Sequence, residues 1–206
     1  MLKIWGRTNS VNVKKALWAA EELGLKYERI DAGLQFGVNK TPEYLKMNPT
    51  GLVPTIEDDG FRLWESHTVV RYLAAKHGAG TLCPSDLQAR ADAERWMDWA
   101  FTSQRAMRDV FWGLIRTPPE KRDAKSIEAG RVSSNQLAAD VLEKSLEKKA
   151  YVCGDRFTMG DIPIGCEVQR WMRVPIERPR LPNVEAWFAR LGERAAFKKI
   201  VDIPLS

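Results

Sequence analysis

Hydroxyl and amide side chains gather at residues 7–12 (RTNSVN), directly after the first apolar run of the chain. The apolar spacing that follows predicts a helix, so these side chains would surround a helix N-terminus. Unpaired main-chain N–H groups and the helix dipole favour a bound anion at such a terminus. A hydroxyl there can donate to a thiolate or a carboxylate, or it can simply cap the helix. The local pattern leaves both interpretations open.

Residues 48–55 (NPTGLVPT) place a proline where a strand should begin. Proline has no N–H to donate to a sheet, so it is unusual at this position. A cis peptide bond before Pro54 would form a tight bend and leave the main chain of Val53 free to pair with an extended ligand. A trans proline on an edge strand is the alternative.

A carboxylate and a hydroxyl, from Glu65 and Ser66, stand immediately before another predicted helix. This pair suits a zwitterionic amino acid, whose amine would bind Glu65 and whose carboxylate would bind Ser66 and the helix N–H groups. Each of the three patterns is weak alone, but their order along the chain is specific.

The elements that must position these residues alternate between strand and helix. Residues 2–6 and 27–31 are typical of strands and flank an amphipathic helix, which predicts a parallel β-α-β crossover. Residues 53–64 predict a hairpin around an Asp-Asp-Gly turn. A helix capped by Ser66 should follow, so the first 78 residues form a mixed sheet covered by helices.

The pattern changes after residue 78, because no further strand alternation occurs. Thr158 and Asp161 predict a capping box at the start of a late helix. Helical stretches are expected at residues 87–112, 125–148, from near Thr158, and at 183–194. The predicted division is an α/β domain at residues 1–78, a linker at 79–87 and an all-helical domain at 88–206.

The composition of the chain excludes several classes of binding partner. The chain has 206 residues, 44% hydrophobic, with a net charge of +5. Basic residues occur in pairs such as Lys14-Lys15, on the polar face of the first helix, and not in a tail, so we expect no nucleic-acid partner. The sequence contains no run of about 18 apolar residues, so no membrane span is predicted. Three widely spaced cysteines and no apolar leader favour the cytoplasm and argue against a disulfide scaffold or a zinc site.

Taken together, these motifs resemble those of the cytosolic glutathione S-transferases, in particular bacterial serine-type, theta-like or nu-like classes. The resemblance rests on residues 48–54, on residues 63–66 leading into 69–73, and on the capping box before Asp161, and it covers essentially the whole chain. It implies a thioredoxin-like N-terminal domain, an all-helical C-terminal domain, and glutathione as co-substrate without a metal.

The resemblance also implies roles for individual residues. The peptide bond before Pro54 would be cis, the main chain of Val53 would pair with the cysteinyl part of glutathione, and Glu65 with Ser66 would hold the γ-glutamyl group. His67 stands where some classes place arginine, and it would lie either at a dimer cleft or facing solvent. The expected glutathione contacts are Arg7, Asn39, Lys40, Leu52, Val53, Pro54, Glu65, Ser66 and His67.

The family activates the thiol of glutathione with a Tyr, Ser or Cys after the first strand, and here neither Tyr nor Cys is near. Ser10 would donate to the thiolate, with Asn12 and Arg7 in support, while Thr8 and Asn9 are competing candidates. A free thiol titrates near pH 8.5, and lowering its pKa by about two units requires roughly 2.7 kcal/mol. One hydroxyl and the helix N–H groups could supply most of it.

The helical domain should line the site for the electrophile. Residues 96–112 form an aromatic and partly basic run, which could also be a core stripe. An arginine beside aromatic rings suits an apolar electrophile that carries a negative group. The expected substrate contacts are Arg105, Arg108, Trp112 and Trp171, whereas Cys153 and Cys166 are expected as small buried residues.

The expected activity is transfer of glutathione to small electrophiles, in detoxification, by a cytoplasmic homodimer. A glutathione-dependent peroxidase or disulfide reductase is one alternative. A non-catalytic glutathione-binding module is the other, because a fold does not fix a function.

Overall fold

A four-stranded sheet organises the first part of the chain in the computed structural model, which describes residues 1–206. Its strand order is β2-β1-β3-β4. Strands β1 (Leu2–Trp5) and β2 (Tyr27–Ile30) are parallel, while β3 (Thr55–Asp58) pairs antiparallel with both β1 and β4 (Phe61–Trp64). The predicted β-α-β crossover and hairpin are therefore confirmed.

The hairpin turn shows why its sequence was informative. Asp59 and Gly60 have φ of 49° and 88°, the left-handed values that a two-residue hairpin turn requires. Strand β3 begins at Thr55, after Pro54, because proline cannot donate to the ladder.

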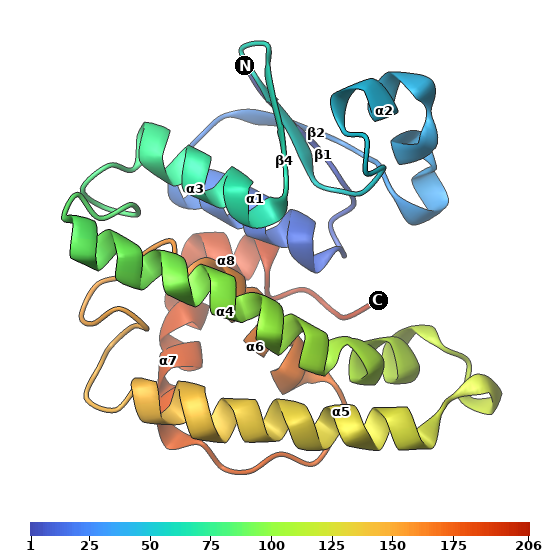
Figure 1. Cartoon of the computed structure of the whole chain (residues 1–206), viewed down its shortest axis with the longest axis vertical. Coiled ribbons are helices and arrows are strands. Elements are labelled where there is room, and N and C mark those ends of the chain that lie inside the picture. The colour runs from blue at the N-terminus through green and yellow to red at the C-terminus, as the bar shows by residue number, and fades with distance from the viewer.

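Three helices accompany the sheet (Figure 1). Helices α1 (Val11–Glu22) and α3 (Ser66–His77) pack against each other, while α2 (Pro42–Met47) lies to one side after two short turns, η1 (Leu34–Phe36) and η2 (Val38–Lys40).

The prediction that α1 exposes a polar face was wrong for both of its lysines. Lys14 and Lys15 are buried, because α1 also packs against α6 (Asp161–Arg173) and α8 (Ala195–Ile200) of the helical part. Nζ of Lys14 donates to the carbonyl of Val201 at 3.0 Å, and burial lowers the pKa of Lys14 to about 8.

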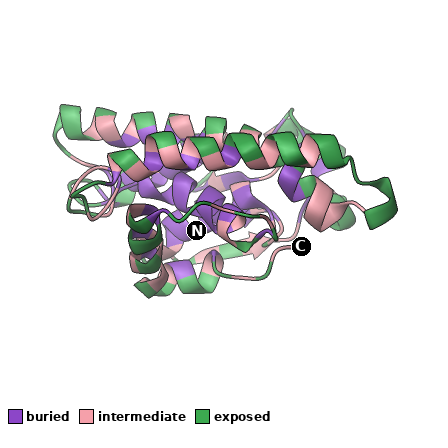
Figure 2. Cartoon of the chain, turned by 90° about the horizontal axis from the view of Figure 1, so that it is seen from below, coloured by how far each residue is buried: buried purple, intermediate pink, exposed green.

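Helices make up the rest of the chain. Helix α4 packs against both α5 and α6, and the outer faces of the long helices are exposed (Figure 2). The last turns of two long helices widen into π-helical turns, η3 and η5. The elements are α4 (Leu87–Phe111), η3 (Trp112–Arg116), η4 (Pro119–Lys121), α5 (Ala124–Leu137), η5 (Ala138–Glu143), α6, α7 (Pro182–Glu193) and α8. None of the helices combines the length and the apolar character needed to span a membrane.

One apolar core runs through both parts of the chain. Trp18 of α1 packs edge-to-face on Phe197 of α8, with ring centroids 5.0 Å apart, and lies 5.6 Å from Phe157. A Cβ on Gly165 would lie 2.8 Å from the Trp18 ring, so glycine lets α6 approach α1 closely.

Helix α6 begins at Asp161, three residues later than the sequence suggested. The Asp161 carboxylate accepts from the N–H of Thr158 at 3.0 Å, as in the predicted capping box, and from Nε1 of Trp187 at 2.9 Å. The Thr158 hydroxyl instead accepts from the N–H of Gly160. Burial raises the pKa of Asp161 to about 6, against these hydrogen bonds.

Candidate functional site

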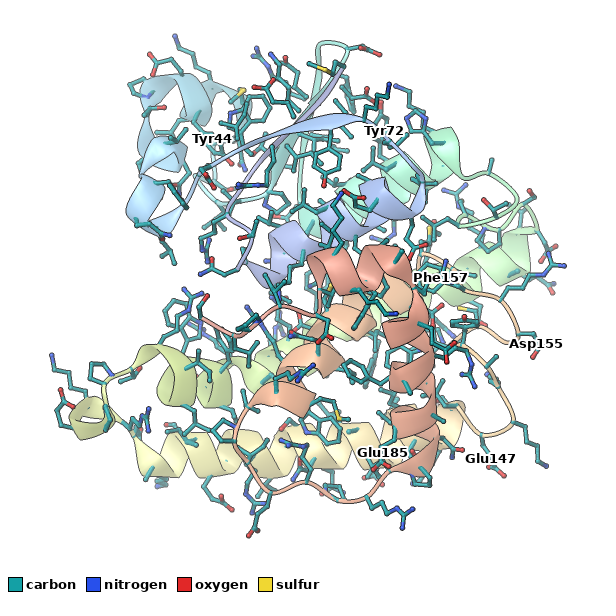
Figure 3. The ribbon with its side chains drawn as sticks, turned by 180° about the vertical axis from the view of Figure 1, so that it is seen from behind. Tyr44, Tyr72, Glu147, Asp155, Phe157 and Glu185 are labelled. Atoms are coloured by element: carbon teal, nitrogen blue, oxygen red, sulfur yellow. The ribbon has the colours of Figure 1, made fainter.

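The bend before β3 presents an unpaired stretch of main chain. The Val53–Pro54 peptide bond is cis, and neither the N–H nor the carbonyl of Val53 makes a hydrogen bond within the chain. Tyr44, labelled in Figure 3, donates through its hydroxyl to the Leu52 carbonyl at 2.6 Å, and Nδ2 of Asn48 donates to the same oxygen at 3.0 Å. Buried polar groups thus hold the bend, while the side chain of Leu52 is exposed.

The N-terminus of α3 lies beside this bend. Thr55 pairs with Trp64 in the β3–β4 ladder, so continuing the register places Glu65 next to Pro54. Glu65 has φ of 69° and exposes a carboxylate that has no hydrogen-bond or ion-pair partner in the chain. Helix α3 begins at Ser66, so the expectation that Ser66 is the N-cap was wrong, and Glu65 occupies that position.

The loop from β1 to α1 brings Ser10 to the same edge of the sheet, because Trp5 pairs with Thr55. Ser10 is buried at the N-cap of α1, and its hydroxyl makes no hydrogen bond to the helix. Thr8 instead lines a separate groove, and Nδ2 of Asn9 donates to Oγ of Ser206 at 2.9 Å. Thr8 and Ser10 both keep a free hydroxyl, but only Ser10 places it at the N-terminus of α1.

A buried polar network connects this loop to the helical part. Nζ of Lys15 lies 3.1 Å from Oδ1 of Asn12, 3.1 Å from Nε2 of His67 and 3.0 Å from Oε1 of Glu167. Gln104 of α4 also donates to Oδ1 of Asn12 at 3.2 Å. The oxygen of Asn12 is thus occupied from both parts of the chain, and the network fixes α1 against α3, α4 and α6.

Of the two positions expected for His67, a dimer cleft or the solvent, the solvent-facing one was wrong. The imidazole is buried, stacks on Phe101 at 4.0 Å between ring centroids, and accepts from Lys15. Burial, with the charges of Lys15 and Arg71, lowers the pKa of His67 to about 2. Desolvation and adjacent cations both disfavour a second positive charge, so the ring is neutral and internal.

Asn39 and Lys40, two of the expected glutathione contacts, differ in their surroundings. Nδ2 of Asn39 donates to the carbonyl of Gly51 at 2.6 Å, so its amide holds the loop before Val53. Lys40 is exposed and has no ion-pair partner, and a Cβ on Gly51 would lie 2.9 Å from its Nζ. Lys40 is therefore the free cation at this end.

The four expected electrophile contacts differ in their surroundings. Trp171 is buried, and its Nε1 donates to Oδ1 of Asn135 at 2.9 Å, so its prediction as a substrate contact was wrong. Arg105 and Arg108 are exposed and make no ion pair. Trp112 is exposed, with the guanidinium of Arg116 5.3 Å from its ring centroid.

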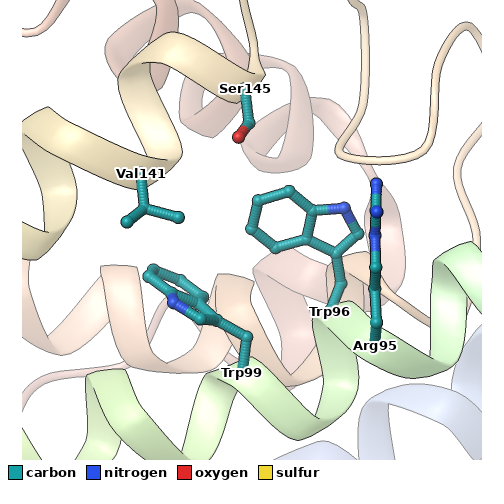
Figure 4. Close-up of a pocket in the computed structure, with 5 residues that line it drawn as sticks. All are labelled: Arg95, Trp96, Trp99, Val141 and Ser145. Carbon is teal, nitrogen blue, oxygen red and sulfur yellow. The ribbon is translucent and has the colours of Figure 1, made fainter.

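A cavity of about 380 Å³ lies elsewhere, between α4 and the helix that η5 continues (Figure 4). It is lined by Arg95, Trp96, Trp99, Val141 and Ser145. None of these residues contributes to the edge formed by Val53, Glu65 and Ser10. The tryptophan pair of α4 therefore belongs to a separate cavity.

The sequence did not predict that five further residues take part in or adjoin the site: Lys15, Gln104, Glu167, Arg116 and Arg170. One signal was available for two of them: Glu167 and Arg170 are ionisable residues in the mostly apolar stretch that forms α6. Ionisable side chains in a buried helix require partners or a function.

Two family models match this chain. Residues 1–75 match the glutathione S-transferase N-terminal domain, and residues 105–195 match the glutathione S-transferase C-terminal domain. The chain belongs to the glutathione S-transferase family. The family, the fold class and the enzyme class predicted from the sequence are thus confirmed.

Similar proteins also support membership of the glutathione S-transferase family. Glutathione S-transferase GstB of Escherichia coli (strain K12) is 44% identical over 209 residues, with 100% of both chains covered. The crystal structure of the theta class glutathione S-transferase from Xanthomonas axonopodis pv. citri with glutathione bound has a TM-score of 0.96 and 46% identity, covering 100% of this chain and 99% of that chain. Its apo form has a TM-score of 0.87 at 42% identity, covering 100% and 98%.

Proposed function

We propose that this glutathione S-transferase binds glutathione along the edge formed by Val53, Glu65 and Ser66, and activates the thiol through Ser10. The observation that carries the proposal is the free hydroxyl of Ser10 at the N-terminus of α1, on the same sheet edge as the unpaired main chain of Val53. The theta class neighbour with bound glutathione supports the ligand.

Each end of the tripeptide then has a partner of suitable chemistry. The N–H and carbonyl of Val53 pair with the cysteinyl residue as an added strand would. The carboxylate of Glu65 binds the γ-glutamyl amine, while Ser66 and the open N–H groups of α3 bind its carboxylate. Lys40 reaches the glycine carboxylate, and Leu52 and Pro54 shape the bend.

The thiol chemistry follows from charge stabilisation. The Ser10 hydroxyl donates to the sulfur, and the N–H groups of α1 add a favourable field, so the thiolate forms near neutral pH and its proton passes to water. The thiolate attacks an electrophilic carbon, a carbon–sulfur bond forms, and the leaving group departs with its electron pair. Asn12, oriented by Lys15 and Gln104, positions the loop, and Arg7 adds positive charge.

Thiolate absorbance of bound glutathione across pH tests the role of Ser10. In Ser10→Ala the pKa of the bound thiol should rise toward its free value, and kcat/KM should fall by about 10²-fold, as for loss of one donor to a developing anion. Thr8→Ala is the matched control and should change neither. An unchanged thiol pKa in Ser10→Ala would contradict the assignment.

We also propose that the enzyme works in the cytoplasm, as a homodimer, in detoxification. Three free cysteines suit a reducing compartment. Phe61 and Phe101, both substantially exposed, offer apolar surface for a second copy. Sedimentation at micromolar concentration checks the dimer, and a monomer there would contradict it. No observation favours the peroxidase or the non-catalytic alternative.

A further inference from the structure

Three arginines from distant parts of the chain lie close to the loop between β1 and α1, which carries Ser10. Arg7 belongs to the loop between β1 and α1, Arg116 ends η3, and Arg170 lies in α6. Burial lowers the pKa of all three, and the charges of Arg116 and Arg170 lower that of Arg7 further. Three like charges held within electrostatic reach of each other favour an anion between them.

Aromatic rings form one side of this cluster. The guanidiniums of Arg170 and Arg116 lie 4.0 Å and 5.4 Å from the ring centroid of Phe111, and Arg116 lies 5.3 Å from that of Trp112. Stacking on a ring face fixes the plane of a guanidinium without using its N–H groups. The rings therefore leave the N–H groups of both arginines to other partners.

The chain supplies almost no acceptor for them. No Asp or Glu lies within ion-pair distance of Arg7, Arg116 or Arg170, and Nε of both Arg7 and Arg116 is buried without a partner. Arg116 donates to an oxygen of Ser206. Glu167 is within electrostatic reach of Arg170, but it lies 3.0 Å from Lys15.

Three other arginines that lie partly buried or at the surface do form ion pairs with carboxylates. Arg194 binds Glu22, Arg173 binds Asp202, and Arg71 binds Asp98. Buried donors that stay unsatisfied are costly and rare in native proteins. The buried Nε groups of Arg7 and Arg116, which have no partner, therefore call for an anionic ligand.

The cluster adjoins the thiol end of the site. A Cβ on Gly33 would lie 3.1 Å from Nη1 of Arg7 and 3.3 Å from Cγ2 of Val53, which places that guanidinium beside the bend. Ser206 contacts both Asn9, next to Ser10, and Arg116, and the C end lies between the two parts of the chain in Figure 1. Arg116 and the loop that carries Ser10 thus contact the same residue.

We propose that Arg7, Arg116 and Arg170 bind a carboxylate on the electrophile, so that the substrate class is an apolar or aromatic electrophile carrying a carboxylate. This inference rests on the proposed glutathione transfer. Phe111 and Trp112 contact the apolar body, and forked guanidiniums match a planar carboxylate. With an aryl chloride, the sulfur–carbon bond forms, the carbon–chlorine bond breaks, and chloride leaves with the electron pair.

Two probe electrophiles that differ in one substituent, which is charged in one and neutral in the other, test the proposal. One is a chlorodinitrobenzene with a carboxylate para to the chlorine, and the other bears a neutral carboxamide there. Each kcat/KM is divided by the rate of the uncatalysed reaction with glutathione, because the two rings differ in intrinsic reactivity. The wild-type enzyme should prefer the carboxylate by roughly 10-fold to 100-fold, the size of one or two charge-assisted hydrogen bonds.

Arg116→Gln should remove most of this preference, while turnover of the carboxamide and the KM for glutathione stay within about threefold of wild type. Arg116→Lys should keep part of it, since the charge remains but the fork is lost. Arg131→Gln is the matched control, because Arg131 pairs with Glu128 on α5, and it should leave the preference unchanged.

Several outcomes would overturn the inference. Equal turnover of the two probes by the wild-type enzyme would contradict it while leaving glutathione transfer intact. An equal loss with both probes in Arg116→Gln would indicate a general effect on the site. A raised KM for glutathione in that variant would assign the cluster to the tripeptide. No turnover of either probe would contradict the proposed function itself.

Discussion

The two ends that we propose for the site, one for glutathione and one for the electrophile, are built in different ways. The glutathione end consists of main chain and of side chains that lie within a few residues of a bend or a helix N-terminus, such as Val53, Glu65 and Ser66. The electrophile end consists of long side chains from the β1–α1 loop, η3 and α6. Local geometry that follows from turn and capping chemistry can be recognised in sequence. The meeting of side chains that lie about a hundred residues apart in the chain cannot be recognised in this way.

We expect the largest effect on stability from the buried ion pair of Lys15 and Glu167, which joins α1 to α6. Lys15→Met would leave Glu167 as a buried, unpaired carboxylate and should lower the free energy of unfolding by about 3–5 kcal/mol, measured by urea denaturation. Replacing both partners, with Lys15→Met and Glu167→Leu, should recover most of this loss. The control Lys198→Met changes an exposed lysine. A loss below about 1 kcal/mol in Lys15→Met would mean that the pair does not hold the two ends together.

Acid should lower the stability of the folded protein through His67, which contacts Lys15 in the same network. His67 has a pKa of about 2 in the folded protein, against an ordinary value near 6.5, so the unfolded chain binds a proton that the folded chain does not. Stability is therefore lost as the pH falls below about 6.5, by roughly 2 kcal/mol at pH 5. In His67→Gln, which keeps an acceptor for Lys15, this part of the pH dependence should vanish. Parallel stability curves for the two proteins would contradict the role given to His67.

At the glutathione end the expected effect is smaller and confined to binding. Glu65→Gln removes the charge that pairs with the γ-glutamyl amine, and Kd for glutathione should rise about 10-fold, or 1.4 kcal/mol, by calorimetry. Glu43→Gln on α2 is the control, because this carboxylate is also exposed. Together with Arg116→Gln, this variant separates the two ends. If Glu65→Gln altered the preference between charged and neutral electrophiles, the separation would fail.

Much of the fold was predictable because its signals are local. The Asp-Gly turn, the β-α-β order and the loss of strand alternation after residue 78 all depend on neighbouring residues. The linker at residues 79–87 stays a prediction. The capping box was half right, since Asp161 accepts from Thr158 while the threonine hydroxyl turns to Gly160.

The errors have a common cause. Lys14 and Lys15 were expected to face water, but the face of α1 that looks polar in sequence is covered by α6 and α8. Trp171 was expected in the pocket, yet it packs inside the helical part and bonds to Asn135. In both cases the burial of a helix face depended on a partner helix far along the chain.

The sequence by itself determined the family, the two kinds of secondary structure, the bend at Pro54 and the pair Glu65-Ser66, because each depends on main-chain conformation and short-range hydrogen bonding. The tertiary structure alone decided that Ser10 keeps a free hydroxyl while Asn9 and Asn12 are occupied. It also decided that Lys15 and His67 are internal, and that Arg7, Arg116 and Arg170 lie within electrostatic reach of one another without an Asp or Glu partner. Burial and charge proximity are properties of the packed molecule, and they set these roles.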